Sequence, residues 1–156
     1  SVRTIRRVEI ARTPVRSSLT AGAGSELQDP APLLLGWLAS RLGWTFASRT
    51  LARDAKSEPV ELVVTDDARS DLAPGQLTAL RLHSLPGGEP LDCSIERTTG
   101  AAAVCWKMRG ARQADREHAL GFHDETWVLI KAIDAREGDA VTRAALLAAA
   151  KWEAAR

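Results

Sequence analysis

The chain has 156 residues, of which 45% are hydrophobic and 26% charged, and its formal net charge at pH 7 is +1. These values are typical of a globular domain with a core of its own, and they exclude a protein that attracts partners through a field of one sign. Apolar runs stay far below the roughly 18 residues of a membrane-spanning helix, and no secretory segment begins the sequence, so we expect one cytoplasmic domain, residues 1–156.

The first expected element is a strand over residues 2–11, in which apolar and charged residues alternate. Val8 and Ile10 would face the core. The doubled arginine at Arg6 and Arg7 interrupts the alternation, which predicts a β-bulge there.

The stretch DPAPLLLGWLASRLGW, residues 29–44, predicts the first helix. Asp29 is a suitable N-cap, Pro30 fits the first helical position, and Gly43 is a typical C-terminal stop. One apolar stripe is the expected core face: Ala31, Leu35, Leu38, Ala39 and Leu42. The opposite side carries a second set of residues: Leu33, Trp37, Ser40 and, just past the helix, Trp44.

This second apolar face needs a cover. Burying its two indoles and its leucine would remove on the order of 500 Å² from water, worth about 10 kcal/mol as an upper bound. Two interpretations remain open. The simpler one is that the chain's own C-terminal helices bury this face, and the other is that another protein does.

Several short strands are expected after this helix. Residues 45–51 alternate weakly, and residues 60–65 form a clearer β run. Residues 77–84 alternate so that Leu80 and Leu82 face inward.

A hairpin is expected after the turn at residues 86–88. A two-residue loop at Thr99-Gly100 aligns apolar residues across the pair: Leu91 with Met108, Cys93 with Trp106, and Ile95 with Val104. A three-residue loop would bring Cys93 opposite Cys105, but it would set Leu91 against a lysine. Because a one-residue slip turns a whole strand over, we favour the apolar register and expect the cysteines on opposite faces, with no disulfide.

Two helices are expected to close the chain. Asp124 is a suitable N-cap for a helix to about residue 136, and Gly138 and Asp139 separate it from the last helix. The apolar stripe of that last helix is Val141, Ala145, Ala148 and Trp152. This order indicates the α+β class: a mainly antiparallel sheet of about five to six strands, with one helix after the first strand and two C-terminal helices packed on it.

The segment LLLGWLASRLGW, residues 33–44, resembles the LL.GWLA.RLGW signature of the OpcA family of glucose-6-phosphate dehydrogenase assembly proteins. The short strands and two closing helices come in a compatible order. Asp139-Ala140-Val141 with Ala145-Leu146 is similar to the family's ending, although Thr142 stands where a tyrosine is expected. The resemblance covers most of the chain and is specific mainly over residues 33–44.

The resemblance implies a non-enzymatic cytoplasmic protein that binds glucose-6-phosphate dehydrogenase, in the oxidative pentose phosphate pathway, and favours its active oligomeric or conformational state. It also implies an N-terminal module that this sequence lacks. Because the sequence also lacks an initiator Met, we expect it to be the C-terminal domain of a longer protein. Since tryptophans in desolvated pockets dominate many interfaces, the expected partner-binding residues lie around this helix: Leu33, Trp37, Arg41 and Trp44.

Three kinds of chemistry lack a signature here. No Gly-x-Ser-x-Gly elbow assembles a catalytic triad, and AGAGS, residues 21–25, lacks the Lys-Ser/Thr of a P-loop. His118 and His123 are five residues apart, a poor spacing for one helix face, so we interpret them as exposed loop residues rather than metal ligands. We expect no catalytic residue, no cofactor and no metal.

The alternative function is a nucleic-acid-binding or phosphate-binding accessory domain that uses an arginine-rich first strand. Five arginines lie near the start: Arg3, Arg6, Arg7, Arg12 and Arg16. Such binding would weaken steeply as salt rises. The chain contains no Tyr and two Phe, so a base-stacking platform is not visible, and nucleic acid is the less favoured partner. These arginines can equally pair with acidic groups of a partner or a missing module.

Overall fold

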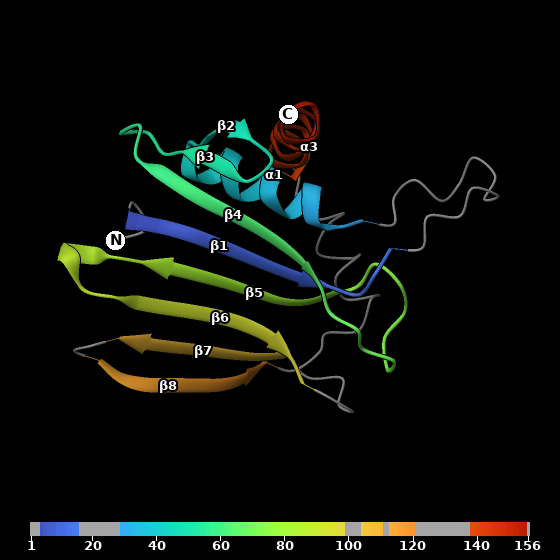
Figure 1. Cartoon of the computed structure of the whole chain (residues 1–156), viewed down its shortest axis with the longest axis vertical. Coiled ribbons are helices and arrows are strands. Elements are labelled where there is room, and N and C mark those ends of the chain that lie inside the picture. The colour runs from blue at the N-terminus through green and yellow to red at the C-terminus, as the bar shows by residue number, and fades with distance from the viewer. Residues whose placement is uncertain (1–3, 16–28, 99–103, 111–112, 121–137, 156) are drawn as a thin grey trace.

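The computed structural model describes residues 4–15, 29–98, 104–110, 113–120 and 138–155 (Figure 1). Its helical elements are α1 (Ala31–Leu42), the short 3-10 helix η2 (Pro86–Gly88) and α3 (Gly138–Ala154). Its strands are β1 (Ile5–Arg12), β2 (Thr45–Ser48), β3 (Leu51–Arg53), β4 (Pro59–Asp66), β5 (Leu77–Ser84), β6 (Leu91–Arg97), β7 (Val104–Gly110) and β8 (Gln113–Leu120). Among these residues, no helix is long and apolar enough to cross a membrane.

The strands form one mixed sheet in the order β2-β3-β4-β1-β5-β6-β7-β8. β1 lies in its interior, parallel to β4 and antiparallel to β5, and the other neighbours pair antiparallel. Parallel neighbours need a crossover, and α1 lies in the connection from β1 towards β4. The α+β class is therefore confirmed, but the sheet is larger than predicted and it contains one parallel pair, β1 with β4.

The core lies between α1 and the middle of the sheet. Val8 and Ile10 of β1 are fully buried in one cluster with Leu35 of α1, as the alternation and the helical spacing predicted. Of the predicted core stripe of α1, only Leu42 is partly exposed. Both helices gather at the β2–β4 end of the sheet, and β6, β7 and β8 lie at the other end (Figure 1).

The C-terminal end of α1 and the bulge in β1 follow the local signals, whereas the helix begins one residue later than predicted, with Pro30 rather than Asp29 as its N-cap. The Asp29 carboxylate accepts a hydrogen bond from the Ala31 N–H at 3.0 Å, and Gly43 ends the helix with φ of 68°. This left-handed conformation costs glycine little because it has no Cβ. The register between β1 and β5 shifts between Ile5 and Arg7, which confirms the predicted bulge.

The pairing of β6 with β7 differs from the predicted register by two residues. Ile95 lies opposite Trp106 rather than Val104, so the connection is longer than two residues. An even shift leaves every side chain on its expected face. Cys93 and Cys105 therefore lie on opposite faces and both are free, as predicted.

The other predictions for the second half of the chain have three different outcomes. β8 was not predicted, and it includes His118, which therefore does not lie in a loop. The predicted helix over residues 124–136, and His123 before it, lie outside the described residues. The final helix is confirmed: Ala145 and Trp152 of its predicted stripe are buried, and Trp152 belongs to the core.

A buried threonine ties the end of β1 to the loop before β5. Thr13 is 2% exposed, and its N–H donates to the Gln76 carbonyl at 2.8 Å. Its hydroxyl donates to the Ala73 carbonyl at 2.6 Å and accepts from the Gln76 N–H at 2.8 Å. The side chain thus completes the hydrogen bonds of a loop that no regular strand pairing supports.

Replacing Thr13 by Val is expected to destabilise the domain. The change leaves the Ala73 carbonyl and the Gln76 N–H without their partner, which costs about 1–3 kcal/mol of unfolding free energy. Urea unfolding followed by tryptophan fluorescence measures the loss. Thr65→Val, at an exposed position of β4, is the matched control and should change stability by less than about 0.5 kcal/mol. Equal effects of the two changes would contradict this role of the hydroxyl.

Candidate protein-binding site

The two helices meet at a glycine. A Cβ at Gly36 would clash with the Ala145 carbonyl oxygen and would lie 2.6 Å from the Ala149 nitrogen. The α3 backbone therefore rests directly on α1, at a position where no larger side chain fits. This close contact holds α3 in one place along α1.

An apolar groove of about 420 Å³ opens beside this contact. Three elements line it: Leu33, Leu34 and Trp37 come from α1, Leu77 from β5, and Val141 and Thr142 from α3. Thr142 alone among these six carries a polar side chain. The volume lies in the range of pockets that receive a ligand or a partner's side chain, roughly 300–1,000 Å³. The groove is thus suited to an apolar group.

The outer side of α1 is left uncovered by the described part of the chain. Leu33 and Trp37 are 43% and 45% exposed, although both are large and apolar. They are four residues apart and so are neighbours on the helix surface. α3 approaches α1 at Gly36 and leaves these two side chains at the edge of the groove. Of the two C-terminal helices expected to cover this face, α3 leaves both side chains exposed, and the other, over residues 124–136, lies outside the described residues.

Trp44 does not belong to this surface, which corrects one predicted partner-binding residue. It is 8% exposed and packs in the core cluster. The helical projection that placed it beside Trp37 ends at Gly43, where the left-handed turn redirects the chain. Arg41, by contrast, is exposed one turn after Trp37. Leu33, Trp37 and Arg41 are thus exposed on α1, whereas Trp44 is buried and lines a separate hollow together with Arg41.

Several groove residues were not predicted from the sequence. Leu34 was assigned to neither face of the helix, Leu77 belongs to a distant strand, and Val141 was assigned to the core stripe of the last helix. No local signal links the three, because their meeting depends on how α1, β5 and α3 pack. The one usable signal was the run of three leucines at the start of α1.

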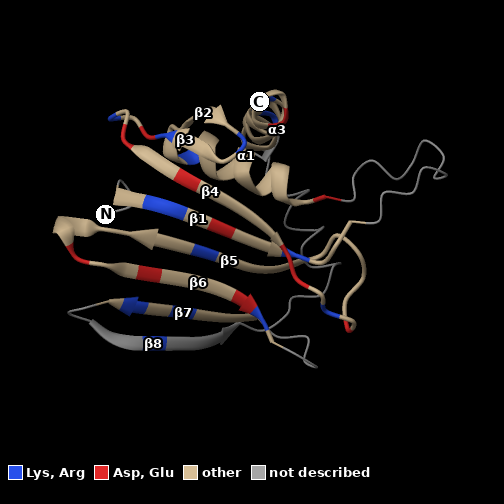
Figure 2. Ribbon diagram, viewed as in Figure 1, with Lys and Arg blue, Asp and Glu red and all other residues tan. Residues whose placement is uncertain are grey.

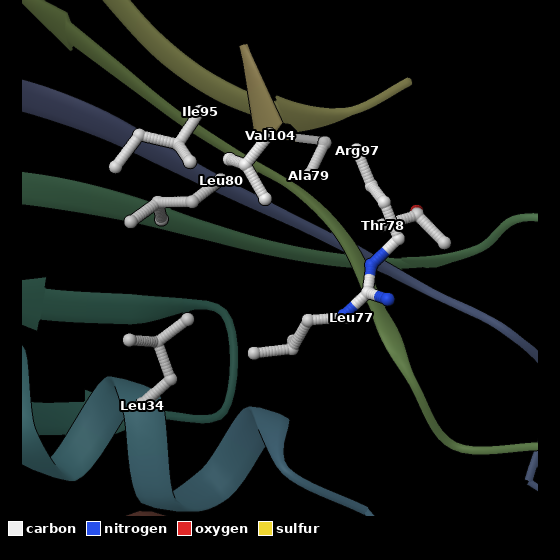
Figure 3. A pocket seen from close by; sticks show the side chains of 8 residues that line it. All are labelled: Leu34, Leu77, Thr78, Ala79, Leu80, Ile95, Arg97 and Val104. Carbon is white, nitrogen blue, oxygen red and sulfur yellow. The ribbon is translucent and has the colours of Figure 1, made fainter. Parts of the chain in front are cut away.

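A second depression continues the apolar surface onto the sheet (Figure 3). It has a volume of about 220 Å³ and shares Leu34 and Leu77 with the groove. Figure 3 shows Leu34 extending from α1 towards the strands that carry Leu80, Ile95 and Val104. Because Leu34 and Leu77 line both, the groove and the depression adjoin each other.

The arginines of β1 are held by carboxylates of the same chain. Arg7 lies 2.7 Å from Glu9 and 3.1 Å from Glu61, and the hydrogen bond to Glu9 raises the pKa of its guanidinium above the ordinary value. The other two described arginines of β1 have two carboxylates each: Arg6 contacts Asp54 and Glu58, and Arg12 contacts Asp29 and Asp66. These charges are already neutralised within the fold.

The same pairing extends across the polar face of the sheet. Figure 2 shows acidic and basic residues interleaved on β4, β1, β5, β6 and β7. Arg81 of β5 lies 2.8 Å from Glu96 of β6, and His83 lies 2.8 Å from Asp92. Opposite charges on neighbouring strands stabilise such pairs modestly. Because these residues are paired with carboxylates, their positive charges are not available to bind a phosphate backbone.

Comparison with protein-family models and with curated proteins yields no match for this chain. The functional argument therefore depends on the site itself, an apolar groove flanked by the exposed Trp37.

Replacing Gly36 by Ala tests whether the helix contact builds the groove. Helix propensity alone would raise the free energy of unfolding by about 1 kcal/mol. The clash with Ala145 should reverse the sign and lower it by about 1–3 kcal/mol. Ser40→Ala, one turn after the glycine on the same helix, removes an atom rather than adding one, so it follows propensity and should be neutral or stabilising. Denaturant unfolding of both variants decides between a loss and a gain at Gly36.

Proposed function

We propose that this chain is a non-enzymatic protein-binding module that docks on glucose-6-phosphate dehydrogenase in the cytoplasm. The observation that carries the proposal is the pair Leu33 and Trp37, exposed at the rim of an apolar groove. An exposed tryptophan beside such a groove is typical of the residues that dominate protein interfaces. The identity of the partner comes from the resemblance of residues 33–44 to the OpcA signature.

The module acts on the dehydrogenase by differential binding. A bound protein shifts an equilibrium between active and inactive states only if it binds the active state more tightly, and a hundredfold preference corresponds to about 2.7 kcal/mol. The groove needs no catalytic side chain for this role. Its contribution is a rigid apolar contact, which the active oligomer or conformation of the dehydrogenase would complete.

Binding of phosphate or nucleic acid is the weaker alternative. It relied on free arginines in the first strand, and Arg6, Arg7 and Arg12 each contact two carboxylates of this chain. A phosphate would have to displace these ion pairs before it gained any contact.

Replacing Trp37 by Ala is expected to abolish most of the docking while the fold remains. Because Trp37 is half exposed, stability should change little, whereas the dissociation constant for the dehydrogenase should rise about 10- to 100-fold. Light scattering coupled to size exclusion, with dehydrogenase from the same source and activity read in the same fractions, measures both binding and activation.

Leu147→Ala is the matched control for this variant. Leu147 is an exposed apolar residue of α3 that does not line the groove, at 61% exposure, so its removal should leave binding within about twofold. If Trp37→Ala binds and activates the dehydrogenase like the unchanged domain, the groove is not the docking site.

A further inference from the structure

Three exposed residues form one straight row along the outer side of α1. Leu33, Trp37 and Arg41 follow each other at intervals of four residues, and all three are exposed. The row therefore spans about 12 Å of helix, at a rise of about 1.5 Å per residue. Rows of this i±4 kind are the ridges with which helices pack against one another.

Arg41 differs from the arginines of β1. It is the sole charged residue of α1, and no carboxylate pairs with it in the described part of the chain. Arg6, Arg7 and Arg12, by contrast, each have two carboxylate partners. The row therefore has two apolar positions, Leu33 and Trp37, followed one turn later by the positive charge of Arg41.

From this row we infer that the site accepts one amphipathic helix of its partner, with apolar side chains against Leu33 and Trp37 and a carboxylate opposite Arg41. The inference rests on the proposed function and adds the chemistry of the partner's segment to it. A helix fits because its own i, i+4 and i+7 side chains repeat at the spacing of the row.

An extended strand does not fit the same surface. Strand addition needs free backbone N–H and C=O groups at a sheet edge, whereas the backbone groups along α1 are bonded within the helix. The outer side of α1 offers side chains alone. Recognition here must proceed by packing side chains of the partner into the groove beside the row, with the ion pair fixing their register.

The two kinds of contact have different physical consequences. The apolar residues enter a desolvated groove and carry most of the affinity, which salt affects little. Arg41 is exposed and does not line the groove, so an ion pair with it would contribute mainly to register and association rate and would be screened by salt. A salt-dependent part of the binding should therefore trace to Arg41 and not to Trp37.

The test measures dissociation constants for the intact domain and glucose-6-phosphate dehydrogenase by isothermal titration calorimetry. At about 50 mM salt, Arg41→Glu should weaken binding about tenfold, because it replaces an attraction by a repulsion. At about 500 mM salt, the difference should fall to about twofold. Arg116→Glu is the matched control: Arg116 is exposed on β8, the opposite end of the sheet, and the change should stay within about twofold at both salt concentrations.

Hydrogen exchange of the dehydrogenase, with and without the domain, identifies the contacted element. We expect new protection over a surface helix that carries an acidic residue, and replacing that residue by Arg should restore binding to the Arg41→Glu variant. Protection confined to a strand or loop overturns the inference, as does equal binding by Arg41→Glu and Arg116→Glu. In either case the proposed function stands, whereas a failure of the unchanged domain to bind overturns both.

Discussion

The structure depends on the burial of one central strand beneath one helix. Val8 and Ile10 of β1 are fully buried in one cluster with residues of α1 such as Leu35, and the sheet extends from β1 on both sides. Fully burying side chains of this size stabilises a fold by roughly 1.5–3 kcal/mol each. Because this contact occupies only one face of α1, the opposite face, with Leu33 and Trp37, takes no part in the core.

The close contact of α1 and α3 at Gly36 leaves a groove beside that exposed face of α1. Since backbone rests on backbone there, α3 cannot slide along α1 without losing contact, and the groove walls are set before any partner arrives. A preformed site loses less conformational entropy on binding than a flexible one. The described arginines of β1 are paired within the sheet and its loops, as Arg7 is with Glu9 and Glu61, whereas Arg41 on α1 has no carboxylate partner in the described part of the chain.

Features that depend on neighbours in the chain follow from the sequence. The stop at Gly43 was predicted correctly, because caps involve residues within one turn of each other, whereas the helix begins one residue later than predicted, with Pro30 rather than Asp29 as its N-cap. The bulge near Arg7 and the separation of Cys93 and Cys105 onto opposite faces also follow, since both express an alternation of period two. The same alternation could not distinguish the observed register of β6 and β7 from the predicted one, because a shift of two residues leaves the faces unchanged.

Features that depend on distant contacts were decided by the tertiary structure. The parallel pairing of β1 with β4 arises from the path of the chain through α1, and β8 has a mostly polar sequence that pairs through β7. Trp44 is buried in the core rather than exposed as predicted, because a helical projection does not hold beyond the left-handed residue Gly43. The sequence alone determined that α1 has a second apolar face. Only the packing of α1 against α3 and β5 decided that this face borders a groove, because Leu34, Leu77 and Val141 are far apart in the chain and meet only in space.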